Sequence, residues 1–354
     1  MKAVVLKKNG ELVLEDRNID QPNNDECRIR IGYCGVCSSD IARGFEFGAY
    51  NYPLVMGHEL SGTVELAGSE CRKFKPGDRV GIFPLKPCFS CPSCIQENYA
   101  QCASYDYYGS RCDGGYGESL NVKEWNLVAL PQDVELEDAA LIEPLSVVVH
   151  GLKKVGLLEQ EAKGQRVLII GCGFLGLLAV QVLEMLESEV EVYVCDRNKF
   201  KLELAKEINA KSIHLENEAA WNTFLQEMPD SFDTVLEMTG FPDNIARTVE
   251  LVSKRGEILL LGNVSGDVSL NKTLVSKILR KEVKIIGSWN STYRPGKADD
   301  WLTSLELIRN GLKPSKLVTH WTSAEDTPVL LNSLAKHKAR QTVFEHLKCM
   351  IRHD

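Results

Sequence analysis

Three segments far apart in the chain carry side chains that suit a zinc ion. They contribute Cys37, His58 with Glu59, and Glu143. Thiolate, imidazole and carboxylate are common zinc ligands, and three protein ligands leave one coordination position open for a substrate, as in catalytic zinc sites. A single such residue is more often a core thiol, a satisfied histidine or a solvated carboxylate. The prediction therefore depends on the other motifs and on their order.

The second motif is a cysteine-rich loop of the form C-x2-C-x2-C-x7-C. Its members are Cys88, Cys91, Cys94 and Cys102. Four thiolates at these spacings can surround one tetrahedral ion, and the intervening prolines and serines supply the turns. Four free thiols in one loop would be exposed to oxidation, and an iron–sulfur cluster is the alternative metal site. We predict a structural zinc, since no second cluster motif accompanies the loop.

The third motif is the glycine-rich stretch VLIIGCGFLG at 167–176, which follows an apolar strand pattern and opens an apolar helix. In dinucleotide-binding folds the first glycine permits a tight turn, the second lets a pyrophosphate approach the helix, and the third allows close packing of helix on sheet. We therefore predict cofactor binding at this turn. The residues concerned are Gly171, Gly173, Phe174, Leu175 and Gly176.

Asp196 follows about 20 residues later, at the end of the next apolar strand pattern. An acid in this position accepts hydrogen bonds from the ribose hydroxyls and repels a 2′-phosphate, so we predict NAD rather than NADP. Arg197 stands beside it and could weaken that preference. The alternative is a glycine-rich turn without a ligand.

Composition narrows the class of protein. With 354 residues, 44% of them hydrophobic and 25% charged, the chain is expected to form two globular domains. A net charge of -8 disfavours nucleic acid or an anionic membrane as partner. The first residues resemble a strand hairpin rather than a signal peptide, and no apolar run reaches the roughly 20 residues of a membrane span. We expect a cytoplasmic protein, whose twelve cysteines serve metal binding or catalysis rather than disulfides.

The pattern of elements changes along the chain. Residues 1–150 contain short alternating runs broken by turn residues, which predict an irregular β-barrel with a hairpin at Asn9-Gly10. Residues 151–290 predict βαβ units and a parallel sheet. Residues 291–354, with a helix at 301–309, are assigned back to the first domain. Strands are predicted at 26–31, 60–66, 78–83, 167–170, 190–195, 233–238, 257–261 and 282–286, and one helix at 243–255, bounded by Pro242 and Gly256.

Taken in order, these motifs resemble the zinc-dependent medium-chain dehydrogenase family over essentially the whole chain. The segments PCFSCPSC at 87–94, YGSRCDGG at 108–115 and IEPLSV at 142–147 are most similar to its polyol dehydrogenase branch, and within it to enzymes acting on a phosphorylated polyol. The resemblance implies a two-domain α/β protein. A GroES-like domain would hold two zinc ions, a Rossmann domain would bind NAD, and catalysis would take place in the cleft between them.

The resemblance also implies roles for single residues. Cys37, His58 and Glu143 would ligate the catalytic zinc, and Glu59 would either ligate it or lie beside it. Ser39 would provide the hydroxyl of a proton relay, and Asp40 would orient His58. Two features depart from the family pattern: 340–343 lacks the usual Gly-Lys-Val, and 348–354 matches no motif that we can interpret.

The predicted reaction is the oxidation of a secondary alcohol of a sugar alcohol to a ketose. Zinc would polarise the alcohol, and NAD would accept the hydride. We predict a phosphorylated polyol, with Arg111 and Trp289 as substrate residues and Arg43 and Arg294 as further cations. The alternatives are an unphosphorylated polyol of the sorbitol or L-iditol type, L-threonine, a zinc-free reductase, or a non-catalytic NAD-binding protein. A homodimer or homotetramer is expected.

Overall fold

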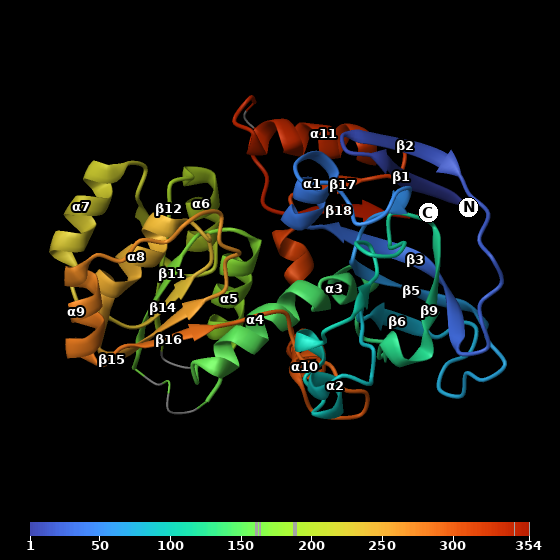
Figure 1. Cartoon of the computed structure of the whole chain (residues 1–354), viewed down its shortest axis with the longest axis horizontal. Coiled ribbons are helices and arrows are strands. Elements are labelled where there is room, and N and C mark those ends of the chain that lie inside the picture. Colours follow the sequence, from blue (N-terminus) through green and yellow to red (C-terminus); the bar gives the residue numbers. More distant parts are fainter. Residues whose placement is uncertain (160–161, 163, 187–189, 343, 354) are drawn as a thin grey trace. The chain divides into compact units, whose positions relative to one another are not determined.

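A computed structural model of the chain describes residues 1–159, 162, 164–186, 190–342 and 344–353 (Figure 1). The chain forms two compact units. Unit 1 contains Met1–Ser146 and Thr292–Asp354, and unit 2 contains Val147–Ser291. Each unit has its own sheets and its own core.

Unit 1 is built mainly from antiparallel strands. One sheet has the order β2-β1-β4, a second has the order β10-β6-β5-β3-β18-β17 with β9 also paired to β3, and β7 pairs with β8. Only β17 and β18 run parallel among these described pairs. The strands are β1 (Lys2–Lys8), β2 (Glu11–Asp16), β3 (Glu26–Val36), β4 (Leu54–Val55), β5 (Glu59–Ala67), β6 (Arg79–Ile82), β7 (Leu85–Lys86), β8 (Asp106–Tyr107), β9 (Ser119–Lys123), β10 (Leu127–Ala129), β17 (His320–Thr322) and β18 (Cys349–Arg352).

The alternation noted in the sequence gives these strands one buried face. Ile29 and Ile31 of β3 lie in the core of unit 1, together with Leu60 and Val64 of β5. The predicted hairpin forms between β1 and β2, and Gly10 takes a φ of +78°, which favours glycine in such a turn.

Helices connect the strands of unit 1, and one of them continues into unit 2. They are α1 (Ser38–Phe45), α2 (Pro92–Ile95), α3 (Leu136–Ala140), α4 (Ile142–Lys154), α10 (Asp300–Arg309) and α11 (Thr327–Lys338), with 3-10 turns η1 (Tyr99–Gln101), η2 (Glu124–Asn126) and η4 (Pro314–Leu317). The boundary between the two units falls within α4. The helix predicted at 301–309 is present as α10.

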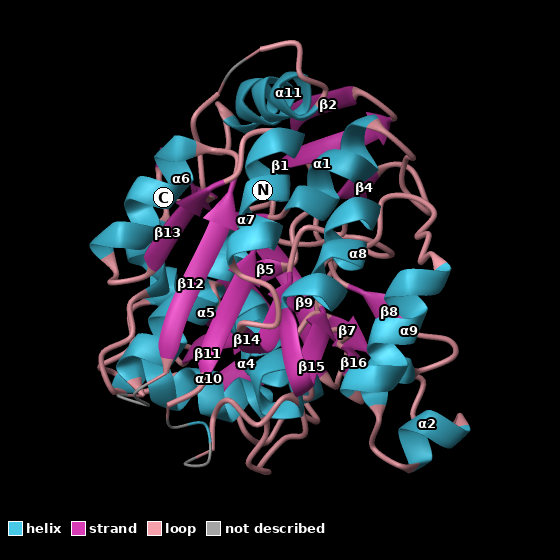
Figure 2. Ribbon diagram, turned by 90° about the vertical axis from the view of Figure 1, so that its left-hand side faces the viewer, coloured by secondary structure: helices cyan, strands magenta, loops and turns pink. Residues whose placement is uncertain are grey.

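Unit 2 contains a parallel sheet of six strands in the order β13-β12-β11-β14-β15-β16, and Figure 2 shows its central strands side by side. The elements are β11 (Arg166–Ile170), α5 (Phe174–Met185), β12 (Glu191–Asp196), α6 (Lys199–Glu207), β13 (Lys211–His214), α7 (Glu218–Glu227), β14 (Phe232–Glu237), α8 (Pro242–Leu251), β15 (Val252–Leu260), α9 (Lys272–Lys281) and β16 (Lys284–Gly287). The predicted doubly wound fold is confirmed, and each predicted strand has a counterpart. The strand β13 was not predicted.

Apolar side chains of the sheet pack against the helices that follow its later strands. Leu168 of β11 and Val235 of β14 share a core with Trp221 of α7, Val249 of α8 and Leu274 of α9. This burial of one sheet face stabilises the unit and leaves the ends of the strands free to carry polar residues.

The helix predicted at 243–255 is too long. It ends at Leu251, and the next strand begins at Val252. Gly256, predicted as the end of the helix, lies inside β15, where a Cβ would meet the carbonyl oxygen of Asp233 at 2.7 Å. The glycine is therefore explained by close approach of two strands.

None of the helices in the described part of the chain combines the length and apolarity needed to cross a membrane. All twelve cysteines are free thiols.

Candidate active site and metal centres

The first predicted metal group lies in unit 1, where β3 meets α1. Cys37 follows β3 and caps the N-terminus of α1, and its backbone N–H donates to Asp40 Oδ2 at 3.1 Å. This places the Cys37 thiol and the Asp40 carboxylate on one tight turn.

His58 reaches this turn from the start of β5. Gly57 before it takes a φ of +93°, and a Cβ there would collide with the ring of Tyr116. His58 Nδ1 lies 3.3 Å from Asp40 Oδ1. With Nδ1 directed at a carboxylate, the other ring nitrogen is free to bind a metal.

Asp40 is fully buried and has two further partners. Tyr116 Oη donates to Asp40 Oδ2 at 3.0 Å, and an Arg43 nitrogen lies 3.4 Å from Asp40 Oδ1. Burial alone would raise the pKa of Asp40, but His58 and Arg43 lower it, so the carboxylate is ionised. Burial alone would lower the pKa of His58, whereas Asp40 and Cys37 raise it well above its ordinary value.

Glu59 completes a group of three ligand residues. Ligand atoms of Cys37, His58 and Glu59 all lie within 4.8 Å of one another. Glu59 stands opposite Gly35 on β3, where a Cβ would collide with Glu59 Oε2. The missing side chain at Gly35 therefore makes room for the carboxylate.

A buried lysine holds Glu59 from the other side. Lys348 Nζ donates to Glu59 Oε1 at 2.7 Å and to the Val36 carbonyl oxygen at 3.0 Å, and it lies 2.5 Å from Glu59 Oε2. The exposed fractions of the two side chains are 4% and 2%. Burial would lower the pKa of Lys348, but Glu59 raises it, so we assign an ion pair.

Glu143 lies beside this group without belonging to the set within 4.8 Å. It is in the first turn of α4, and Tyr107 Oη donates to its Oε1 at 3.1 Å. Burial, with a smaller contribution from the neighbouring Glu59, raises the pKa of Glu143 to about 7, although His58 opposes the shift. Two buried carboxylates close to one histidine are more stable when a cation lies between them.

Ser39 lies in the first turn of α1, two residues after Cys37, and is half-buried. All five residues predicted as catalytic thus lie in unit 1, and three of them, Cys37, His58 and Glu59, have their ligand atoms within 4.8 Å of one another.

The buried polar atoms of the site fit a metal. Glu59 Oε2 is buried without a well-directed hydrogen bond, although Lys348 Nζ lies near it, and His58 Nδ1 faces Asp40, which leaves Nε2 of the ring for an ion. Thiolate, imidazole and carboxylate in this arrangement form a donor set suited to zinc.

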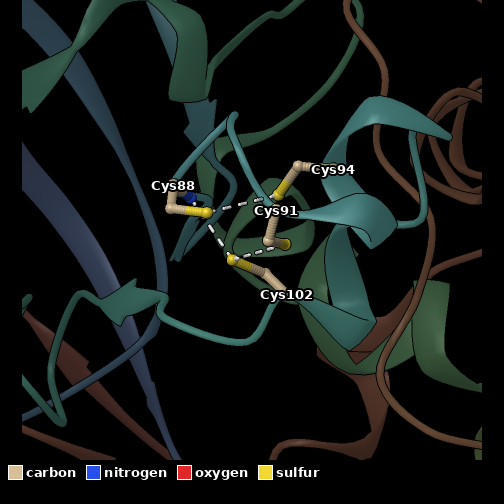
Figure 3. Close-up of side chains that lie close together, drawn as sticks. All are labelled: Cys88, Cys91, Cys94 and Cys102. Atoms are coloured by element: carbon tan, nitrogen blue, oxygen red, sulfur yellow. Dashed lines mark hydrogen bonds between the residues drawn. The ribbon is translucent and has the colours of Figure 1, made fainter.

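The second metal group is the cysteine-rich loop, drawn in Figure 3. The four sulfurs of Cys88, Cys91, Cys94 and Cys102 lie within 4.8 Å of one another. Cys88 Sγ is 3.9 Å from Cys94 Sγ, and Cys91 Sγ is 4.0 Å from Cys102 Sγ. Four sulfurs at about 2.3 Å from a tetrahedral zinc would be about 3.8 Å apart, so the loop fits the ion.

The local hydrogen bonds of this loop favour thiolates. The backbone N–H and the hydroxyl of Ser90 lower the pKa of Cys88 to about 6. The backbone N–H of Ala103 lowers the pKa of Cys91, whereas burial raises that of Cys94 to about 12. A bound cation would offset the cost of ionising the buried Cys94 thiol.

Unit 2 contains the predicted glycine-rich turn between β11 and α5. Gly171 takes a φ of +108°, and a Cβ there would lie 2.7 Å from Thr239 Cγ2. Gly173 caps α5 and faces open space, while a Cβ on Gly176 would collide with the Gly171 carbonyl oxygen. Phe174 and Leu175 begin α5 and are half-buried. The turn, the open approach and the close packing expected of the three glycines are all present.

Asp196 stands at the end of β12 and is tied to this turn. Its Oδ2 accepts from the Cys172 backbone N–H and its Oδ1 from the Asn198 backbone N–H, each at 2.8 Å. Each oxygen retains a lone pair for a ligand. Arg197 is exposed beside it.

The predicted substrate residues lie in different units. Arg111 is in unit 1 and lies over two tyrosine rings. Trp289 follows β16 in unit 2 and has an exposed fraction of 58%. Its role stays a prediction. Val343 and Asp354 of the two C-terminal segments without a family match lie outside the described residues.

Sequence reasoning missed two residues of the site. Lys348 falls in the C-terminal segment left without interpretation, and its only local signal is the apolar stretch that follows it and forms β18. Tyr107, which contacts both Glu143 and the His58 ring, could have been suspected from the run Tyr105 to Tyr108 beside the polyol-type motif.

Comparison with known proteins agrees with this arrangement. Residues 23–132 match the alcohol dehydrogenase GroES-like domain, and residues 137–329 match the glucose dehydrogenase C-terminus. Galactitol 1-phosphate 5-dehydrogenase of Escherichia coli is 35% identical over 95% of this chain and 97% of its own. The chain belongs to the zinc-dependent medium-chain dehydrogenase family. The sequence resemblance to this family, and to galactitol 1-phosphate 5-dehydrogenase within it, is confirmed.

Structural similarity supports the same placement in the zinc-dependent medium-chain dehydrogenase family. The crystal structure of galactitol-1-phosphate dehydrogenase from Escherichia coli matches with a TM-score of 0.87 and 33% identity over 100% of both chains. A sorbitol dehydrogenase of Halalkalibacterium halodurans is 28% identical over 90% of this chain and 91% of its own. The protein is thus a zinc-containing alcohol or polyol dehydrogenase, with a GroES-like domain and a Rossmann domain.

Proposed function

We propose that the protein oxidises a secondary alcohol of a polyol to a ketose, with one catalytic zinc and NAD. The observation that carries this proposal is the convergence of Cys37, His58 and Glu59 on one buried point of unit 1. We assign unit 1 as the catalytic domain and unit 2 as the NAD-binding domain.

Cys37 and His58 would hold the catalytic zinc, with Glu59 and Glu143 as the carboxylates available to it. When bound, the two cofactors supply Lewis-acid stabilisation of charge on the substrate oxygen and a hydride acceptor. The chain itself fixes the donors: Asp40 holds the His58 ring, Lys348 holds Glu59, and Tyr107 donates to Glu143. Prepositioned donors of this kind reduce the reorganisation needed during reaction.

Proton removal from the alcohol requires a path from the buried site to solvent. Ser39 is half-buried and lies two residues after Cys37, in the first turn of α1, so its hydroxyl can accept the substrate proton and pass one outward. Replacing it with alanine should lower kcat without removing zinc.

The remaining sites have supporting roles. Cys88, Cys91, Cys94 and Cys102 would hold a second, structural zinc that fixes their loop. The glycine-rich turn with Phe174 and Leu175 would bind the pyrophosphate of NAD, and Asp196 the adenosine ribose. Arg197 lies where it could permit some use of NADP.

We favour a phosphorylated polyol as substrate, because the 35% identical relative is named for galactitol 1-phosphate. An unphosphorylated polyol of the sorbitol or L-iditol type is the alternative, supported by the 28% identical sorbitol dehydrogenase. L-Threonine is a further alternative, since an L-threonine 3-dehydrogenase of Deinococcus deserti is also 28% identical.

We further propose a cytoplasmic homodimer or homotetramer that acts without nucleic acid or a membrane. β16 is an edge strand of the unit 2 sheet, and Ile285 on it has an exposed fraction of 45%, which suits pairing with a second copy.

Metal analysis combined with turnover tests the proposal. The purified protein should contain two zinc ions per chain and reduce NAD in the presence of sugar alcohols or their phosphates. Cys37→Ser and His58→Ala should abolish turnover and leave NAD binding intact. A metal-free preparation that turns over at the rate of the zinc-loaded protein would contradict the catalytic zinc, and NAD binding without any alcohol oxidation would favour a non-catalytic protein.

A further inference from the structure

We propose that Arg111, supported by Tyr50 and Tyr105, forms the subsite that binds the phosphate of a phosphorylated polyol. This inference rests on the proposed polyol dehydrogenase function and adds the group that would select the phosphorylated substrate.

The Arg111 side chain is cationic and held in place without an acidic partner. Its Cζ lies 4.5 Å from the centroid of the Tyr50 ring and 4.2 Å from that of the Tyr105 ring. Among the residues that the structure describes, no carboxylate forms an ion pair with it, and its backbone N–H donates to the Tyr107 carbonyl oxygen. The guanidinium therefore has N–H donors available to a ligand.

The other two candidate arginines are already paired. An Arg43 nitrogen lies 3.4 Å from Asp40 Oδ1, where it supports the carboxylate that faces His58. An Arg294 nitrogen lies 3.7 Å from Glu97 Oε2. A phosphate at either position would compete with a carboxylate, whereas at Arg111 it would not.

A series of aromatic contacts connects Arg111 to the metal ligands. The His58 and Tyr107 ring centroids are 5.8 Å apart, and those of Tyr107 and Tyr105 are 6.3 Å apart. Tyr105 is the ring beneath the Arg111 guanidinium. The cation and the proposed catalytic zinc ligands therefore lie along one continuous aromatic run within unit 1. In the proposed complex, a substrate that places a carbinol at the metal would extend along this run toward the cation.

The rings of Tyr50 and Tyr105 hold the Arg111 guanidinium in an orientation that allows it to bind an oxyanion. Ring faces attract its plane, while its N–H groups point outward along its edges, where they can bind phosphate oxygens in pairs. Tyr50 has an exposed fraction of 66%, so solvent reaches the stack. Asn51 Nδ2 donates to the Arg111 carbonyl oxygen at 3.3 Å and fixes the loop of Tyr50 against that of Arg111.

The test compares galactitol with galactitol 1-phosphate on zinc-loaded wild type and Arg111→Gln. We expect kcat/KM for the phosphate to fall about 10- to 100-fold, as for loss of a charged hydrogen-bonded contact, with little change for galactitol. Arg111→Lys should recover part of the loss, because it keeps the charge without the paired donors. Arg309→Gln, which removes an exposed arginine paired with Asp133, should match wild type.

Inorganic phosphate gives a second measurement that does not depend on turnover of a phosphorylated substrate. It should inhibit galactitol oxidation by wild type and inhibit Arg111→Gln at least about tenfold more weakly. Equal losses for both substrates, or unchanged phosphate inhibition in Arg111→Gln, would overturn the subsite and leave the polyol dehydrogenase function standing. Absence of turnover of both substrates and of other sugar alcohols by wild type would overturn the proposed function itself.

Discussion

Lys348 Nζ and the Glu59 carboxylate form a buried ion pair in unit 1, with a distance of 2.7 Å to Oε1. The pair joins the segment before the last strand to the start of β5, across 289 positions of sequence. It sits beside the Cys37 and His58 donors, so the same carboxylate faces a lysine and a proposed metal ion.

Removing the lysine should destabilise the metal-free protein. Lys348→Met leaves Glu59 buried without its cation, and loss of one partner of a buried pair costs about 3–5 kcal/mol of the free energy of unfolding. Urea unfolding of chelator-treated protein measures the change. Lys338→Met breaks an exposed pair with Glu46 and should cost less than about 1 kcal/mol.

Bound zinc should reduce the loss of stability caused by Lys348→Met, because the metal supplies a positive charge beside Glu59. The difference in unfolding free energy between wild type and Lys348→Met is therefore expected to shrink when both are loaded with zinc. A double variant, Glu59→Gln with Lys348→Met, should also recover stability in the metal-free protein. If metal-free Lys348→Met and metal-free wild type had the same free energy of unfolding, the Lys348–Glu59 pair would not stabilise the fold.

Gly35→Ala should displace the same carboxylate from the opposite side. The added methyl group would collide with Glu59 Oε2, and overpacking of this kind costs about 1–3 kcal/mol. We expect lower stability, weaker zinc retention and reduced kcat, measured on one preparation. Gly44→Ala in α1 is the control, because its Cβ would lie 3.6 Å from Met56 Cε, an ordinary contact. If Gly35→Ala retains zinc and activity like the control, the absence of a side chain at Gly35 is not required to position the Glu59 carboxylate.

The parts of the site whose local geometry follows from the sequence are those specified by neighbouring residues. The turn at Gly171 and the acid at Asp196 follow from glycine spacing and from two apolar strands, all within a short stretch. The end of α8 was harder to place, because Val252 to Arg255 fit a helical pattern until Gly256 is seen packed against β14. Lys348 could not be assigned from sequence, since its role arises only when β18 pairs with β3.

The structural zinc should be separable from the catalytic one. Cys94→Ser removes a buried sulfur from the loop of Figure 3, so zinc content should fall from two ions to one per chain and the melting temperature should drop. The donors Cys37 and His58 are unchanged, so the remaining ion should be the catalytic one. Cys71→Ser alters a thiol outside both groups and should keep both ions. Unchanged zinc content in Cys94→Ser would contradict the site.

Cofactor preference should depend on the charge of Asp196. Its carboxylate accepts from Cys172 and Asn198 and keeps lone pairs for ribose hydroxyls, while its negative charge opposes a 2′-phosphate. Asp196→Asn removes that charge, so kcat/KM for NAD should fall about tenfold or more while the ratio for NADP over NAD rises. Arg197 is unchanged and remains available to the 2′-phosphate. Glu227→Gln makes the same charge change at an exposed position of α7 and should leave the ratio at its wild-type value. If Asp196→Asn lowers activity with both cofactors by the same factor, Asp196 holds only the glycine-rich turn, and another group selects NAD.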